Sequence, residues 1–161
     1  MKYLFLDIDG VLNTGKYQDI LMESGQHLFD EDGALFDPEA IQNLEGIIEE
    51  TDAKIVITST WRLDGDMQAL WKNRDLAGEV VGVTPTVLKG KAIGKLKVHY
   101  GHRGMEVEEW LQSDAIEPYN YAILDDEDDF LPHQANHLVL TNPYDGLTRE
   151  IADRVIEILL R

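Results

Sequence analysis

Residues 2–11, KYLFLDIDGV, decide the fold of this chain. Their apolar run from Lys2 to Ile8 predicts a strand that is buried on both faces of a parallel sheet. Asp7 and Asp9 fall at the end of this strand, and a glycine-led turn follows them. Two carboxylates buried at the end of a core strand destabilise a fold unless they are paired or bind a cation. The segment therefore predicts a central strand with a cation site at its carboxyl end.

Strands and helices alternate along the rest of the chain. Apolar runs predict further strands at Lys54–Thr58, Glu79–Val83, Tyr121–Leu124 and His137–Thr141. Apolar stripes of helical period predict helices at 64–73 and 103–113, one that starts at Asp37-Pro38, and one introduced by Gly146 and Thr148. This alternation favours an α/β fold of Rossmann type, a mostly parallel central sheet with helices on both faces.

Residues 11–36 interrupt the alternation. They show no clean period and contain several glycines, so we expect a long loop or flap, with an insert at about 13–36. An insert of this length can form a flap but not a folded cap domain. Because no repeat, low-complexity tract or linker follows, we expect a single domain over residues 1–161.

The composition excludes several kinds of site. The chain of 161 residues has 43% hydrophobic residues, an ordinary globular value, and no cysteine. Disulfides, thiolate metal sites and cysteine nucleophiles are therefore excluded, and we expect a cytoplasmic location. No apolar run approaches the roughly 18 residues that span a bilayer, so we expect no membrane partner. Composition does not decide the oligomeric state.

The net charge of -17 bears on the choice of substrate. A field of this sign repels polyanions at long range, which argues against a general nucleic-acid binder. Residues 80–105 differ from the rest, because they contain no acid but hold Lys89, Lys91, Lys95 and other basic side chains. This basic stretch is either a solvated loop or a surface that selects an anionic substrate, and the sequence leaves both interpretations open.

Polar side chains follow the strands where the strands end. Thr58 and Ser59 close the second strand, and Asp125 and Asp126 directly continue the fourth. In open parallel sheets the site lies beyond the carboxyl ends of the strands. Hydroxyls also cap strand ends, and the acidic run 125–129 by itself is typical of a solvated loop. Asp125 and Asp126 differ from the rest of the run because they continue a strand, and carboxylates there suit Mg²⁺.

Arg103 supplies the cation of this set. It opens the helix that leads into the fourth strand, where the helix dipole slightly disfavours a positive charge. A cation placed against that preference indicates another task, such as binding a substrate phosphate. Carboxylates, a hydroxyl and a cation at strand ends together indicate phosphoryl transfer.

These segments resemble the haloacid dehalogenase-like (HAD) superfamily of phosphohydrolases. Residues 5–12, FLDIDGVL, resemble its first motif, and Thr58 matches the hydroxyl of the second motif, with Ser59 as an alternative. Arg103 falls where the superfamily has a basic residue, and Asp125-Asp126 resembles the double-aspartate form of the fourth motif.

A narrower resemblance is to the HAD domains associated with Swiss Army Knife RNA repair proteins. It rests on residues 58–62 (TSTWR), on Arg103-Gly104, and on Asp125-Asp126 followed by Phe130-Leu131. By association it implies RNA-end processing, although a fold does not fix a substrate. We therefore expect a phosphorylated partner, either a small molecule such as a nucleotide or an RNA 3′-phosphate end.

The resemblance implies a chemical role for each of these residues. Asp7 would attack the phosphorus and form an aspartyl-phosphate. Asp9 would act first as an acid and then as a base, which requires a raised pKa. Thr58 and Arg103 would contact the phosphoryl oxygens.

The resemblance also implies the ligands of Mg²⁺ and the contacts to the substrate. The metal would be held by Asp7, the backbone carbonyl of Asp9 and Asp126, with Asp125 or Asp129 in support. The expected substrate contacts are Ser59, Gly10, Lys89 and Lys91.

Two other classes of protein are alternatives to the phosphatase. A receiver domain of the response-regulator type uses similar groups around Mg²⁺, but in a different chain order. A catalytically silent HAD-like module would bind metal and phosphate without turnover, and it would not need to keep the acid Asp9.

Overall fold

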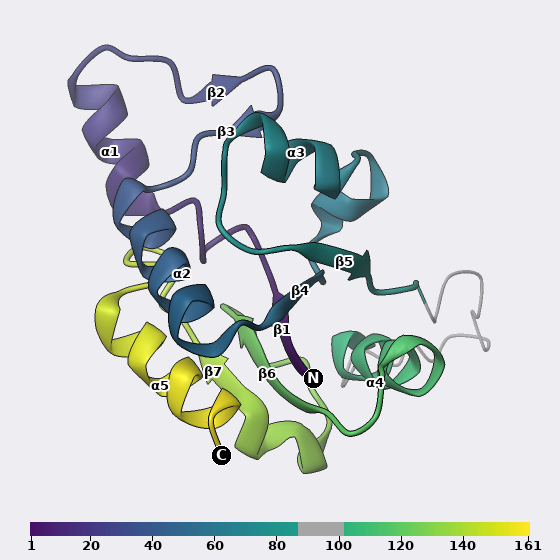
Figure 1. Ribbon diagram of the computed structural model, residues 1–161. Helices are drawn as coiled ribbons and strands as arrows, with labels where there is room; N and C mark the ends of the chain where they lie inside the picture. Colours follow the sequence, from purple (N-terminus) through teal and green to yellow (C-terminus); the bar gives the residue numbers. More distant parts are fainter. Residues whose placement is uncertain (87–101) are drawn as a thin grey trace, which may run out of the picture.

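Residues 2–6 form the central strand of a five-stranded sheet in the computed structural model, which describes residues 1–86 and 102–161. The strands of this sheet are β1 (Lys2–Leu6), β4 (Lys54–Ile57), β5 (Val80–Val83), β6 (Asn120–Asp125) and β7 (Leu138–Leu140). They pair in parallel in the order β5-β4-β1-β6-β7 (Figure 1). The predicted α/β fold with a parallel central sheet is therefore confirmed.

The order of the strands reverses next to β1. The chain runs from β1 to β4 and β5 on one side, and then crosses to β6 and β7 on the other. The switch in strand order therefore lies between β1 and β6, where Leu6 pairs with Leu124. Ligands of open α/β sheets bind at such a switch point, beyond the carboxyl ends of the strands.

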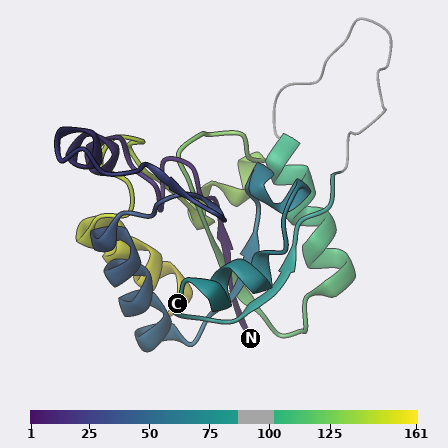
Figure 2. The ribbon, with the colours of Figure 1, turned by 90° about the horizontal axis from the view of Figure 1, so that it is seen from above.

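Helices cover both faces of the sheet (Figures 1 and 2). Along β1, Leu4 and Leu6 pack into a larger core, and Tyr3 and Phe5 pack into a smaller core on the opposite face. The larger core is completed by α2 (Pro38–Thr51), α3 (Met67–Asn73) and α5 (Arg149–Leu159). The smaller core is completed by α4 (His102–Asp114), whose Trp110 ring lies edge-on to Phe5 at 5.6 Å. Burial on both faces explains why β1 is almost continuously apolar.

The segment between β1 and α2 contains more structure than the sequence predicted. It forms α1 (Gly15–Glu23) and a short hairpin of β2 (Phe29–Asp30) and β3 (Gly33–Ala34). The expectation of a loop was wrong for α1, because Leu21 is the one buried residue of this helix and no apolar stripe marks it in the sequence. Helix and hairpin lie beyond the carboxyl ends of the strands (Figure 1). The described residues contain no cap domain.

Two short 3₁₀ helices, η1 (Thr60–Leu63) and η2 (Pro132–His137), were also not predicted. Because η1 takes up the residues that follow β4, α3 begins at Met67 and not at Asp64. Residue His137 ends η2, so β7 begins one residue later than predicted. Within residues 1–86 and 102–161, no helix has both the length and the apolar character needed to cross a membrane.

Candidate active site

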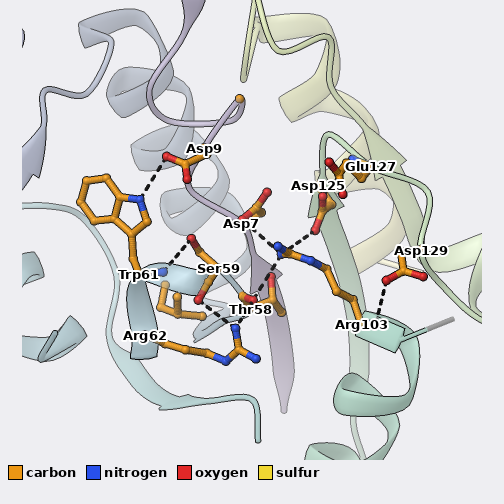
Figure 3. Close-up of polar contacts among 12 residues, drawn as sticks. Asp7, Asp9, Thr58, Ser59, Trp61, Arg62, Arg103, Asp125, Glu127 and Asp129 are labelled. Carbon is orange, nitrogen blue, oxygen red and sulfur yellow. Dashed lines mark hydrogen bonds and ion pairs between the residues drawn. The ribbon is translucent and has the colours of Figure 1, made fainter. Parts of the chain in front are cut away.

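Three carboxylates meet at the switch point of the sheet. Asp7 directly follows β1, and its N–H donates to the carbonyl of Leu124 at 3.0 Å, so the pairing with β6 continues to this residue. Asp125 ends β6 and Asp126 follows it. Asp7, Asp125 and Asp126 each present one oxygen within 4.8 Å of the others, and the first two side chains are buried. We call these three residues the strand-end cluster, and Figure 3 shows two of them, Asp7 and Asp125, on either side of the Arg103 guanidinium.

Gly10 makes room for the third carboxylate. It has a φ of +76°, and a Cβ at this position would overlap the carboxylate of Asp126. The carbonyl of Gly10 is held in turn by the hydroxyl of Thr141, which donates to it at 2.8 Å. Gly10 therefore has a steric task at the cluster, and its expected contact with substrate stays a prediction.

Arg103 reaches the cluster from the start of α4. Its Nη1 lies 3.3 Å from Oδ1 of Asp7, 3.3 Å from Oδ2 of Asp125 and 3.2 Å from the carbonyl of Thr58. The carboxylate of Asp129 accepts from the backbone N–H groups of His102 and Arg103, at 3.1 and 3.2 Å. This acid therefore caps α4 and offsets the unfavourable position of the cation at a helix N-terminus. Of the two supporting ligands expected, Asp125 lies in the cluster, whereas Asp129 is engaged at the helix.

The cluster carries more negative charge than one arginine neutralises. Burial raises the pKa of Asp7 to about 6, against the opposing influence of Arg103. Burial and the neighbouring Asp7 raise the pKa of Asp125 to about 8. Both shifts mean that the ionised carboxylates are destabilised in this setting. A set of oxygen ligands with unbalanced negative charge fits a hard divalent cation such as Mg²⁺.

The two hydroxyls at the end of β4 have different environments. The Oγ1 of Thr58 is buried and has no hydrogen-bond partner among residues 1–86 and 102–161. Ser59 accepts from the backbone N–H of Trp61 at 3.3 Å and thereby caps η1. A buried hydroxyl without a partner is costly, and a phosphoryl oxygen would satisfy it. Thr58 is therefore the better candidate, and the capping alternative describes Ser59.

Asp9 lies beside the strand-end cluster but does not belong to it. Its side chain is exposed, and its Oδ1 accepts from Nδ2 of Asn13 at 2.7 Å. The same oxygen accepts from Nε1 of Trp61 at 3.0 Å (Figure 3). The indole ring of Trp61 is partly buried and packs against the larger core, and its N–H is the donor of the second of these hydrogen bonds. The metal contact expected from the backbone of Asp9 stays a prediction.

Arg62 is the residue that sequence reasoning missed. Its Nη1 donates to the backbone carbonyls of Thr58 and Ser59 at 2.8 and 2.9 Å, and its Nε donates to the backbone carbonyl of Thr84 at 2.8 Å. Its Nη2 forms a buried ion pair with Glu106 of α4 at 3.1 Å. Arg62 therefore fixes the strand end that carries Thr58. The signal was its place in the TSTWR segment, but the backbone carbonyls that it binds have no sequence signature.

A hollow of about 550 Å³ opens next to the cluster. It is bounded by α1, the β2–β3 hairpin and the loop after β7, and its lining includes Asp9, Gly10, Asn13, Phe29, Asp126 and Tyr144. Phe29 and Tyr144 are more than half exposed there. The other two expected substrate contacts, Lys89 and Lys91, lie outside the described residues.

Comparison with known families adds one finding. The family model described as the HAD domain in Swiss Army Knife RNA repair proteins matches residues 3–152, which include β1 from Tyr3 onward, the strand-end cluster, Thr58 and Arg103. No protein with a curated description matches the chain.

Proposed function

The chain belongs to the family of HAD domains in Swiss Army Knife RNA repair proteins, and on that premise we propose that it is a Mg²⁺-dependent phosphatase that forms an aspartyl-phosphate on Asp7. Membership by itself indicates a phosphohydrolase-like or RNA-repair module. The observation that carries the finer proposal is the strand-end cluster, in which Asp7, Asp125 and Asp126 converge and Arg103 contacts two of the three.

The residues of the cluster would hold the metal. Asp7, Asp125 and Asp126 offer carboxylate oxygens, which Mg²⁺ prefers, and their mutual repulsion is relieved when a cation joins them. When bound, Mg²⁺ would screen Asp7 from the charge of the phosphate and stabilise the charge that develops during transfer.

The proposed chemistry has two steps. In the first, a carboxylate oxygen of Asp7 forms a bond to phosphorus, the bond from phosphorus to the ester oxygen breaks, and Asp9 gives its proton to that oxygen. In the second, water attacks the phosphorus of the aspartyl-phosphate and gives a proton to Asp9, which frees Asp7 and inorganic phosphate. The sum is an ester plus water converted to an alcohol plus phosphate.

Thr58 and Arg103 would bind the phosphoryl oxygens during both steps. The buried Oγ1 of Thr58 has no partner among residues 1–86 and 102–161 and can donate to such an oxygen, and the guanidinium of Arg103 already lies between the nucleophile and Asp125. A cation placed there neutralises charge on the transferred group without having to move.

The substrate class is a phosphomonoester with an accessible end, either a nucleotide or an RNA 3′-phosphate. The described residues leave the site open beside α1, and the hollow there has exposed rings on which a leaving group can pack. For a longer chain, Lys89 and Lys91 remain the proposed contacts, on the strength of the acid-free basic stretch.

Phosphate release tests the proposed reaction. Nucleotides, sugar phosphates and an oligonucleotide 3′-phosphate are incubated with the protein, with and without Mg²⁺. We expect Mg²⁺-dependent release that Asp7→Asn abolishes. Thermal stabilisation by Mg²⁺ together with no release from any substrate would support the silent binding module instead.

A second experiment tests the substrate contact. Replacing Lys89, Lys91 and Lys95 with Gln should raise KM for the oligonucleotide much more than for an aryl phosphate, and should flatten its dependence on salt. Equal loss on both substrates would indicate damage at the site, and no loss on either would favour the solvated loop.

A further inference from the structure

We propose that Trp61 and Asn13 are positioning residues that hold Asp9 by one carboxylate oxygen and leave the other for the substrate. This inference rests on the proposed function, in which Asp9 protonates the ester oxygen. It assigns a task to two side chains that are not expected to touch the reacting atoms.

Both hydrogen bonds to the carboxylate of Asp9 converge on the same oxygen. Nδ2 of Asn13 donates to Oδ1 at 2.7 Å, and Nε1 of Trp61 donates to Oδ1 at 3.0 Å. Within the described part of the chain, Oδ2 receives no hydrogen bond from a protein group. Two N–H donors on Oδ1 leave Oδ2 as the oxygen that can exchange a proton with a substrate.

Asn13 is itself held in one orientation. Its side chain is buried, and its Oδ1 accepts from the backbone N–H of Gly10 at 3.0 Å. Because the amide oxygen faces Gly10, the amide nitrogen must face Asp9. The turn that follows β1 thus orients its own acid through a side chain four residues further along.

The ring of Trp61 is held by contacts with the β2–β3 hairpin, with Phe36 and with Arg74. Its ring packs on Phe36, with centroids 5.6 Å apart. The guanidinium of Arg74 lies 4.4 Å from the Phe36 ring and 5.9 Å from that of Trp61, and it also donates to the carbonyl of Gly33 at 3.1 Å. The N–H of Trp61 therefore points at Asp9 from a ring that is packed on several sides.

Such support is needed because Asp9 is exposed. A free aspartate on a turn samples several rotamers, and an acid contributes only when it lies within hydrogen-bond reach of the leaving oxygen. Hydrogen bonds that hold the carboxylate in the productive rotamer increase the fraction of molecules in which the acid can reach the leaving oxygen. The benefit depends on the leaving group, since a poor leaving group needs the proton and a good one hardly does.

The test compares two substrates in Trp61→Phe, which removes the indole N–H and keeps a flat ring. We expect kcat on an alkyl phosphate, a poor leaving group, to fall about tenfold, and kcat on 4-nitrophenyl phosphate to change less than about twofold. The matched control is Trp71→Phe, because Trp71 donates its indole N–H to the carbonyl of Ala77 at 3.1 Å, away from the cluster.

A double-mutant cycle separates positioning from general damage. In an Asp9→Asn background, Trp61→Phe should cause no further loss on the alkyl phosphate, because the group that Trp61 orients is no longer an acid. Equal loss on both substrates, additive loss in the cycle, or no loss at all would overturn the inference. A wild-type protein that releases phosphate from neither substrate would instead overturn the proposed function itself.

A measurement without turnover tests the contact directly. The indole N–H of Trp61 gives one of three tryptophan side-chain signals by NMR, and Trp61→Phe identifies it. We expect Asp9→Ala to shift this signal and to speed its hydrogen exchange, while the signal of Trp71 stays unchanged. An unaltered signal from Trp61 would mean that the hydrogen bond to Asp9 is not formed.

Discussion

The two halves of the site are built in different ways. In the strand-end cluster, Asp7 and Asp125 are buried and extend paired strands, so backbone hydrogen bonds of the sheet fix them. On the other half, which we call the insert side, Asp9 is exposed and is held by the side chains of Asn13 and Trp61. The sheet therefore concentrates charge for the metal and the phosphate, whereas residues outside the sheet orient the acid.

The largest effect is expected in the strand-end cluster. Asp7→Asn should lower kcat more than about a thousandfold while the fold stays intact, because an amide of the same shape cannot act as the nucleophile. Phosphate release and circular dichroism measure the two properties. The matched control is Asp128→Asn, which changes an exposed acid of the run after β6 and should retain activity. A variant at Asp7 that keeps more than a few per cent of the rate would contradict the covalent mechanism.

Binding of Mg²⁺ separates the two halves. At about one hundred times its Kd, Mg²⁺ should add about 2.7 kcal/mol to the free energy of unfolding and raise Tm by roughly 5–10 °C. The double variant Asp7→Ala, Asp126→Ala should lose this shift in a thermal melt. Asp9→Ala should retain it, since the carboxylate of Asp9 lies outside the cluster. A shift that survives in the double variant would place the metal elsewhere.

The pH dependence of stability gives a third contrast. The pKa of Asp125 is raised to about 8 from 3.8, chiefly by burial and then by Asp7. A carboxyl with a higher pKa in the folded state binds its proton more tightly there, so its contribution to stability is complete below pH 4 and is lost as the pH rises towards 8. In protein treated with EDTA, Asp125→Asn should therefore gain several degrees of Tm relative to the wild type between pH 5 and pH 8.

Saturating Mg²⁺ provides the control for that experiment. The metal stabilises the ionised carboxylates of the wild type. With Mg²⁺ bound, the Tm of Asp125→Asn should therefore no longer rise relative to that of the wild type as the pH increases. A difference in Tm that stays constant from pH 5 to pH 8 without metal would show that the carboxyl of Asp125 does not titrate in this range.

The strand-end cluster could be predicted from the sequence, because its residues are placed by the strands of the sheet. Buried strands leave a long apolar run, and a carboxylate at the end of such a run is conspicuous, as at Asp7 and at Asp125-Asp126. The order of parallel strands then brings these ends together. The same rule predicted a hydroxyl at the end of β4. The choice between Thr58 and Ser59 as the phosphate-binding hydroxyl required the structure, which shows that Ser59 caps η1.

The insert side could not be predicted in the same way. Because α1 buries one residue and each strand of the hairpin has two, these elements leave no periodic pattern in the sequence. The contact between Trp61 and Asp9 joins residues 52 positions apart through a side-chain nitrogen, and nothing in the local sequence marks it. Arg62 was missed for the same reason, since it binds backbone carbonyls, which every residue has.

The smallest effect is expected on the insert side, from Gly33→Ala in the hairpin. A Cβ at Gly33 would lie 2.9 Å from the Trp61 ring, so the ring must move and its N–H must shift relative to Asp9. We expect about threefold lower kcat on an alkyl phosphate and little change on 4-nitrophenyl phosphate or in the Mg²⁺-induced rise of Tm. Gly25→Ala is the control, because Gly25 also has a positive φ, +66°, but a Cβ there would meet no atom within 4 Å. If both alanine variants slowed the two substrates alike, the effect would arise from backbone strain. The hairpin would then have no part in orienting the acid, and the orientation of Trp61 would depend on its packing against Phe36.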